Sequence, residues 1–183
     1  YFRLVPHQEA PTNICWGDRN RSVLVRVPLG WTTPINMINL VNPQEKGRIV
    51  DFSNKQTVEV RSPDGSADIY MLLSAITIAA RTGFEMNNPI DLAKNTYVDI
   101  NIFDEENKKK QKELDQLPSS CVESARRLED QRSYYTKYDV FPDSVIDLLI
   151  KTLINKNDEG LIGRIQNDDE KVMDLVTKYF NCG

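Results

Sequence analysis

The sequence is poor in histidine and cysteine, the residues that bind zinc and form disulfides. Its 183 residues include one histidine, His7, and three cysteines, Cys15, Cys121 and Cys182. The cysteine count is odd and no CxxC spacing occurs, which argues against a disulfide framework and against a cysteine-based zinc site. We therefore expect buried or free thiols in a reducing compartment, and this predicts a cytoplasmic protein.

Long apolar runs and a large net charge are lacking too. No run is long enough to span a membrane, and a net charge of -4 gives no reason to expect a nucleic-acid or membrane partner. The charge is uneven, because residues 1–61 carry eight basic and five acidic residues, a net +3, and the remainder carries -7. An arginine-rich segment on an acidic protein predicts a local anionic ligand. The sequence opens on Tyr1 rather than Met, so we expect a truncated chain.

The first third of the chain alternates in the manner of β-strands. Residues 12–28 predict two strands joined by a tight turn at residues 17–20, with Arg26 opposite the valines of its strand. Residues 57–61 predict a further antiparallel strand that places Glu59 and Arg61 on one face, together with Arg26. Residues 30–56 are polar and predict a long loop.

The rest of the chain has helical periodicity. A helix is predicted from about 67 to 81, capped by Ser66 and ended by Gly83, and its apolar residues surround the axis as in a core helix. Residues 104–116 predict a solvated helix or mobile loop. Further helices are predicted at residues 119–134, 145–152 and 172–180. The pattern indicates an α+β fold, β-rich over residues 1–65 and helical over 66–183.

Several charged residues fall in or beside the predicted strands. The set consists of Arg3, Glu9, Arg21, Arg26, Glu59 and Arg61. Guanidinium groups fork onto carboxylates and phosphates, and a carboxylate beside them can help to bind Mg²⁺ together with substrate phosphate. Such a set suits phosphoryl transfer. The alternative is that these arginines are solvated or paired with neighbouring carboxylates, as ion-pair networks often are.

Three sequence blocks resemble the glutamine synthetase family, in particular the C-terminal half of the catalytic domain of the bacterial, type I-like enzymes. Residues 3–11 (RLVPHQEAP) resemble its RLVPxxEAP segment, residues 19–28 (RNRSVLVRVP) its RNRSxxxRxP segment, and residues 58–70 (VEVRSPDGSADIY) its VEVRFPDPSANPY segment. The similarity is close to residue 83 and looser to about 150. It implies that residues 1–183 are part of one catalytic domain, with strands of a partial catalytic barrel.

The resemblance implies a role for each matching residue. Arg3 would bind the substrate glutamate, and Glu9 would lie on a flap over it and assist deprotonation of ammonium. Arg21 would contact ATP phosphate and the transferred phosphoryl group, and Arg26 would bind ATP phosphate. The remaining roles are a metal ligand for Glu59, a contact to glutamate and the phosphoryl group for Arg61, and a charge near ATP for Lys55.

The implied reaction is ATP-dependent ligation of ammonia to L-glutamate through γ-glutamyl phosphate, with Mg²⁺ or Mn²⁺ as cofactor. The implied assembly is a homo-oligomer, a ring-type dodecamer. Two alternatives stay open, namely a ligase for another amine and a non-catalytic assembly protein. Other metal ligands and the adenine pocket would lie before Tyr1, so we expect this segment alone to be inactive.

The sequence also departs from the family. Thr57 stands where the family commonly has an arginine, and Lys55 is the nearest basic residue. Tyr97 is the nearest match to the tyrosine that regulated bacterial enzymes nucleotidylate, but the leucine and proline that follow in the family are missing, so we expect an ordinary packed tyrosine. The family's usual ending is not recognisable after residue 155. His7 falls in the flap segment and not at a metal position.

Overall fold

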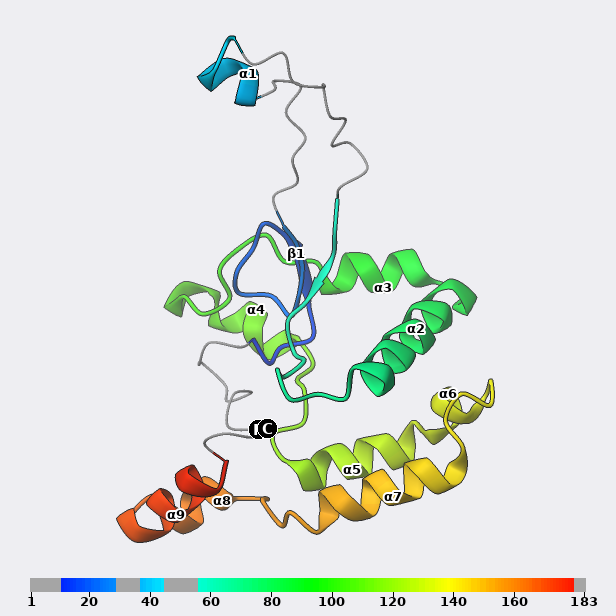
Figure 1. Cartoon of the computed structure of the whole chain (residues 1–183), viewed down its shortest axis with the longest axis vertical. Helices are drawn as coiled ribbons and strands as arrows, with labels where there is room; N and C mark the ends of the chain where they lie inside the picture. Colours follow the sequence, from blue (N-terminus) through cyan, green and yellow to red (C-terminus); the bar gives the residue numbers. More distant parts are fainter. Residues whose placement is uncertain (1–10, 29–36, 45–55, 180–183) are drawn as a thin grey trace.

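The computed structural model describes residues 11–28, 37–44 and 56–179 (Figure 1). Within these ranges the chain is α+β, with one small sheet and a helical remainder. The predicted roles of Arg3, Glu9 and Lys55 fall outside the described residues, as does the predicted flap.

The sheet has three short strands in the order β1-β2-β3. They are β1 (Trp16–Asp18), β2 (Val25–Val27) and β3 (Glu59–Val60). Strands β2 and β3 pair antiparallel, as predicted, but β1 and β2 pair parallel. The prediction of two antiparallel strands joined by a tight turn at residues 17–20 is therefore wrong.

The reason lies in residues 19–22, which form an anchored loop instead of a hairpin turn. Arg19 has a left-handed backbone with φ of 55°, and its N–H donates to the carbonyl of Val27 at 2.7 Å. The Asn20 side chain donates to the carbonyls of Val98 and Ile100 at 3.1 and 2.8 Å. These long-range bonds hold the loop open, so the chain re-enters the sheet in the same direction.

A first core cluster lies behind the sheet. It contains the buried residues Cys15, Val23, Val98, Ile102 and Leu114. The segment after helix α3 (Pro89–Thr96) completes this cluster by bridging to β1, where the Val98 N–H donates to the Trp16 carbonyl at 2.8 Å. Tyr97 packs on the Trp16 indole with 4.9 Å between ring centroids.

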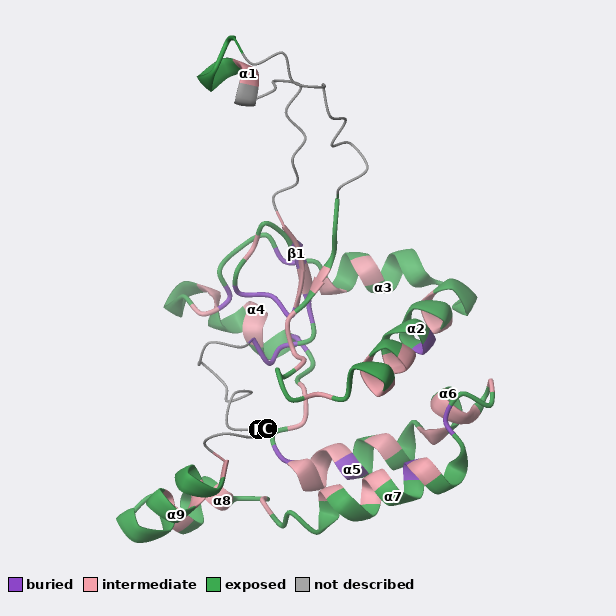
Figure 2. Ribbon diagram, viewed as in Figure 1, coloured by how far each residue is buried: buried purple, intermediate pink, exposed green. Residues whose placement is uncertain are grey.

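Helix α2 (Ile69–Glu85) differs from its prediction in three ways. Its N-cap is Asp68, which accepts from the Met71 N–H, because Ser66 instead bonds to Asp64 in the preceding turn. Gly83 lies within the helix rather than after it. Of its residues only Ile78 is buried (Figure 2), so α2 is not a core helix. Met71 and Ala75 are half-buried on the packed face, and the apolar side chains of Ile69, Leu73, Ile76 and Phe84 are exposed.

The helical remainder largely follows the predicted periodicity. The predicted helices at 119–134, 145–152 and 172–180 correspond to α5 (Cys121–Asp130) with α6 (Arg132–Thr136), α7 (Asp143–Ile154) and α9 (Asp169–Tyr179). Helices α5 and α7 lie side by side (Figure 1). A second core cluster joins them to α2 through Ile78, Phe141 and Ile146.

Four short elements complete the described chain. They are α1 (Met37–Val41), η2 (Glu105–Asn107), α4 (Lys108–Glu113) and α8 (Leu161–Ile165). Helix α1 interrupts the predicted loop at 30–56. Residues 104–116, for which a solvated helix or a mobile loop was predicted, contain η2 and α4 and are therefore mainly helical. Among the described helices, none combines the length and the hydropathy that a membrane span requires.

Candidate functional site

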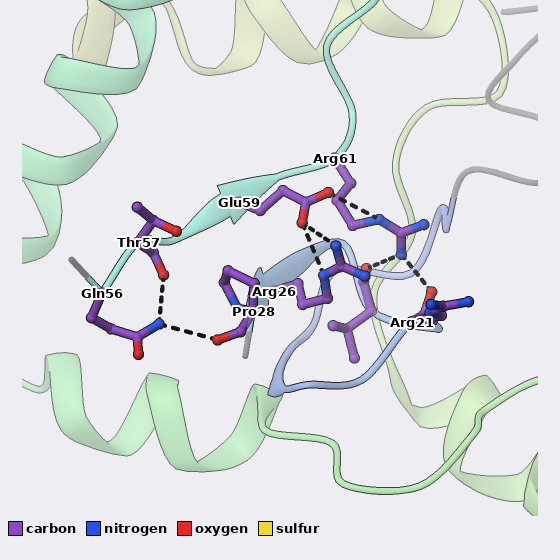
Figure 3. A network of polar contacts seen from close by, with 8 residues as sticks. Arg21, Arg26, Pro28, Gln56, Thr57, Glu59 and Arg61 are labelled. Carbon is purple, nitrogen blue, oxygen red and sulfur yellow. Dashed lines mark hydrogen bonds and ion pairs between the residues drawn. The ribbon is translucent and has the colours of Figure 1, made fainter. Parts of the chain in front are cut away.

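The site is built on the pairing of β2 with β3. Arg26 and Glu59 are directly opposite each other in the antiparallel register. The Arg26 guanidinium donates from Nε and Nη2 to Oε2 of Glu59 at 2.9 and 2.5 Å (Figure 3). Cross-strand partners have their Cβ atoms about 5 Å apart, so the two side chains meet without distortion of the backbone.

Arg61 approaches the same carboxylate from the other side (Figure 3). Its Nε lies 3.8 Å from Oε1 of Glu59. Its Nη1 donates to the backbone carbonyls of Arg21 and Val23 at 2.5 and 3.0 Å. The prediction that Arg26, Glu59 and Arg61 share one face is confirmed. The donation from Arg61 to two carbonyls was not predicted.

The cluster formed by Arg26, Glu59 and Arg61 carries a net positive charge. The side chains of Arg26 and Arg61 are 24% and 18% exposed, and that of Glu59 is 41% exposed. Two guanidinium groups offset by one carboxylate leave one unit of positive charge in a partly desolvated place. Partial burial weakens screening, so such a cluster attracts an anion more strongly than free surface arginines do.

Glu59 fits the part of one metal ligand but not that of a whole metal site. Arg26 engages Oε2, whereas the contact given for Oε1 within the described ranges is the 3.8 Å approach of Arg61. One carboxylate oxygen is therefore placed to coordinate a hard cation, which prefers oxygen ligands. In the described ranges no three histidine, cysteine, aspartate or glutamate side chains gather closely enough to hold an ion.

Arg21 joins the cluster through its backbone rather than its side chain. Its carbonyl accepts from Arg61, and its exposed side chain lines an open hollow. The other residues that line the hollow are Asn20, Ser22, Asn101 and Phe103. Sequence reasoning missed these neighbours, although Asn20 and Ser22 flank Arg21 in the RNRS block and could have been noticed there.

Thr57 stands where the family commonly has an arginine, and the neighbouring Gln56 makes polar contacts there. The side-chain amide of Gln56 donates to the carbonyls of Pro28 and Thr57, both at 3.2 Å (Figure 3). This pair of bonds ties the residue after β2 to the residues before β3. Among the described residues, the contacts at this place come from a neutral amide between two backbone carbonyls.

The chain is similar to glutamine synthetases over most of its length. A family model described as glutamine synthetase, catalytic domain, matches residues 1–159. A glutamine synthetase of Pyrococcus abyssi is 33% identical over 133 residues, covering 72% of this chain and 25% of that protein. One of Aquifex aeolicus is 31% identical over 159 residues, covering 87% of this chain and 29% of that protein. One of Azotobacter vinelandii is 32% identical over 152 residues, covering 82% and 27%.

The matched region contains every described residue of the cluster. Arg26, Glu59 and Arg61 lie within residues 1–159, and the RNRS and VEVR blocks that carry the resemblance are the segments that meet at the β2–β3 pair. The chain spans about a quarter of the length of the curated relatives it matches. With more than four-fifths of its residues matched by the family model, the chain belongs to the glutamine synthetase catalytic-domain family.

Proposed function

We propose that the full-length protein carrying this chain ligates ammonia to L-glutamate at the expense of ATP, through a γ-glutamyl phosphate intermediate. The observation that supports this most is the Arg26–Glu59–Arg61 cluster. Two guanidinium groups converge on one carboxylate at the strand pair where two family blocks meet. A positive, partly buried cluster suits a reaction that moves a phosphoryl group between two anions.

The charge of each residue in and beside the cluster suits a separate role in the reaction. Arg26 binds ATP phosphate, and Arg61 stabilises glutamate and the transferred phosphoryl group. Arg21 reaches the phosphate from the neighbouring loop. Fixed guanidinium groups stabilise charge that develops in the transition state because they are already oriented before it forms. Glu59 holds Arg26 in place through Oε2, and its carboxylate would serve as one ligand of the cation.

The cofactor we propose is Mg²⁺ or Mn²⁺, with Glu59 as one of its ligands. Such a cation, when bound, offsets negative charge on the phosphates of ATP. Glu59 supplies a single carboxylate, so the other ligands would be phosphate oxygens of ATP, water, or residues outside the described ranges. Arg3 and Glu9 at the glutamate site and Lys55 near ATP remain proposals of the same kind.

The wider setting of the protein is also proposed from the family. The three-stranded sheet would be part of the catalytic barrel, and the protein would assemble as a ring-type homo-oligomer in the cytoplasm. Two alternatives remain. A glutamate–amine ligase would use the same cluster with another acceptor, and a non-catalytic relative would assemble without turnover. The retained Glu59 and arginines favour a catalytic protein.

The test is an assay of the full-length protein with ATP, Mg²⁺, glutamate and a set of amines. We expect ADP and glutamine in equal amounts with ammonium, and little product with methylamine or ethanolamine. Faster turnover with an organic amine would support the amine ligase, and no ADP release under any condition would support the non-catalytic protein.

A paired substitution connects this activity to the cluster. Arg26→Gln removes one of the two guanidinium groups that face Glu59, and we expect a loss of about a hundredfold in turnover. Arg127→Gln is the matched control, since Arg127 is an exposed residue of α5 outside the cluster. Equal activity of the two variants would contradict the proposed role of the cluster.

A further inference from the structure

The loop that carries Arg21 is held by two side chains, those of Asn20 and Ser22, which have no part in the proposed function. Asn20 and Ser22 stand on either side of Arg21, and Ser22 is 4% exposed. All polar atoms of the Asn20 amide are engaged. Its nitrogen donates to the carbonyls of Val98 and Ile100 at 3.1 and 2.8 Å, which uses both hydrogens.

The oxygen of the same amide closes the loop on itself. Oδ1 of Asn20 accepts from the backbone N–H and from the hydroxyl of Ser22, both at 2.8 Å. The Ser22 hydroxyl in turn accepts from the Ile102 N–H at 3.3 Å and lies 3.3 Å from the Ile100 carbonyl. Asn20 and Ser22 thus form a clasp, by which we mean these two side chains and their bonds to residues 98–102.

The clasp fixes the backbone on both sides of Arg21, and Arg61 fixes the residue itself by donating to the Arg21 carbonyl. Among Asn20, Arg21 and Ser22, it is Arg21 whose side chain is exposed. It lies beside the open hollow that Asn101 and Phe103 also line. Asn20 and Ser22 lie between β1 and β2 and their partners lie in residues 98–102, so the bonds that lead the chain into the parallel pairing also hold the backbone that carries Arg21.

We propose that Asn20 and Ser22 are positioning residues, which hold the Arg21 guanidinium where the phosphoryl group is transferred. This rests on the proposed function, in which Arg21 contacts ATP phosphate and the transferred group. Arginine has several rotatable bonds, so its reach is defined only if its own Cα is fixed. A misplacement of about 1 Å at a reacting group costs on the order of a hundredfold in rate, and this sets the scale of the effect.

The experiment compares five variants of the full-length protein, namely Asn20→Ala, Ser22→Ala, Ser22→Thr, Arg21→Ala and the double variant Asn20→Ala/Arg21→Ala. We expect Asn20→Ala and Ser22→Ala to lower kcat/KM for ATP by about tenfold to a hundredfold. Because the clasp acts through Arg21, the double variant should be no slower than Arg21→Ala alone. Ser22→Thr, which keeps the hydroxyl, should retain most of the activity.

A second readout does not depend on activity. Hydrogen exchange of the amides in residues 19–24 and 98–102 should accelerate in Asn20→Ala and not in the control Asn95→Ala, because Asn95 is an exposed residue of α3 outside the clasp. Unchanged exchange in Asn20→Ala would show that the clasp does not hold the loop, and would overturn the proposal.

The kinetic outcomes separate this inference from the proposed function. If Arg21→Ala is impaired while Asn20→Ala and Ser22→Ala are fully active, the positioning role is wrong and the function stands. If the losses of Asn20→Ala and Arg21→Ala multiply in the double variant, the clasp does not act through Arg21. If Arg21→Ala itself is fully active, the proposed role of Arg21 fails and the positioning role fails with it.

Discussion

At the scale of single residues, Glu59 shows how one carboxylate can organise two guanidinium groups. Arg26 and Arg61 repel each other unless a negative charge lies between them, and Glu59 contacts both. The sequence predicted that Glu59 and Arg61 share a face from their two-residue spacing. It did not predict that Arg61 also donates to the carbonyls of Arg21 and Val23, because no sequence pattern reports a bond to a distant backbone oxygen.

A second cluster of charged residues connects α2 to the segment after α6. Glu85 accepts from the Tyr138 hydroxyl, and from Lys137 at 2.9 Å and Arg81 at 2.9 Å. The Arg81 guanidinium lies 3.6 Å from the centroid of the Tyr138 ring. The hydrogen bond from Tyr138, followed by those from Lys137 and Arg81, lowers the pKa of Glu85 from 4.5 to about 2.

The lowered pKa of Glu85 predicts a dependence of stability on acid. A carboxyl group whose pKa is lower in the folded state stabilises the fold above its unfolded pKa and loses this contribution as the pH falls through the folded value. We therefore expect the melting temperature to fall between about pH 4.5 and pH 2, and Glu85→Gln to flatten this part of the curve. Glu113→Gln, at an exposed position outside the cluster, is the control, and an equal flattening in it would contradict the assignment.

At the scale of elements, helix α5 has a cap from a distant part of the chain. Ser120 accepts from the Glu123 N–H at its N-terminus, and Asp158 accepts from the N–H groups of Cys121 and Val122 at 2.8 and 3.2 Å. Burial raises the pKa of Asp158, but the bonds from Cys121 and Val122 outweigh this and lower it overall. Asp158 thereby fastens the segment after α7 to the start of α5.

Loss of this cap should destabilise the α5–α7 pair. We expect Asp158→Ala to lower the free energy of unfolding by about 1 kcal/mol, as removal of a helix N-cap does. Glu159→Gln is the matched control because its partner Arg126 is exposed and such surface pairs contribute little. Chemical denaturation of both variants provides the comparison, and an equal shift in the two midpoints would show that Asp158 is only a surface charge.

Replacement of glycine by alanine should have opposite effects on stability at Gly17 and at Gly83. A Cβ on Gly17 would lie 2.3 Å from the carbonyl oxygen of Val98, so Gly17→Ala must push β1 away from its bridge to that segment, at a cost of roughly 1–3 kcal/mol. A Cβ on Gly83 meets nothing within 4 Å, and alanine is a better helix former by about 0.5–1 kcal/mol. Thermal unfolding should therefore place Gly17→Ala below the parent and Gly83→Ala above it.

The helices and the antiparallel β2–β3 pair were predictable from the sequence, and the parallel pairing of β1 with β2 was not. The stripes in α7 and α9 are local and repeat every three or four residues, so the sequence alone indicates them. The parallel pairing of β1 with β2 depends on Asn20 and its partners 78 and 80 residues away. The periodicity of α2 was recognised, but how many of its faces are covered depends on the tertiary structure and not on the helix itself.

The candidate site was predictable to the same extent. Arg26, Glu59 and Arg61 follow from alternation in two strands, and their meeting needed only an antiparallel β2–β3 pair. The clasp of Asn20 and Ser22 was not predictable from the sequence, since it depends on backbone groups of residues 98–102. Gln56 was missed for a similar reason, because it acts through the carbonyls of Pro28 and Thr57.

At the scale of the whole molecule, the described part of the chain supplies only one side of the proposed site. The cluster supplies a single carboxylate, and the chain spans about a quarter of the length of its curated relatives. We therefore expect the isolated 183-residue chain to form no glutamine from ATP, Mg²⁺, glutamate and ammonium. The full-length protein at the same molar concentration is the control. Glutamine above background from the isolated chain would mean that these residues suffice for catalysis.

If Glu59 belongs to a metal- and phosphate-binding site, its removal should impair function without loss of the fold. In the full-length protein Glu59→Ala should cost on the order of a hundredfold or more in turnover, because the cation that offsets phosphate charge loses a ligand. The melting temperature should change little, since partly exposed ion pairs contribute only about 0–1 kcal/mol.

The measurement that tests this most directly is the turnover of Glu59→Ala and of the parent across a titration with Mg²⁺ and then Mn²⁺, beside their melting temperatures. We predict slow turnover that needs a higher metal concentration, with a nearly unchanged melting temperature. Near-normal turnover with the parent's metal dependence would contradict the account and leave Glu59 as a carboxylate that only pairs with Arg26 and Arg61.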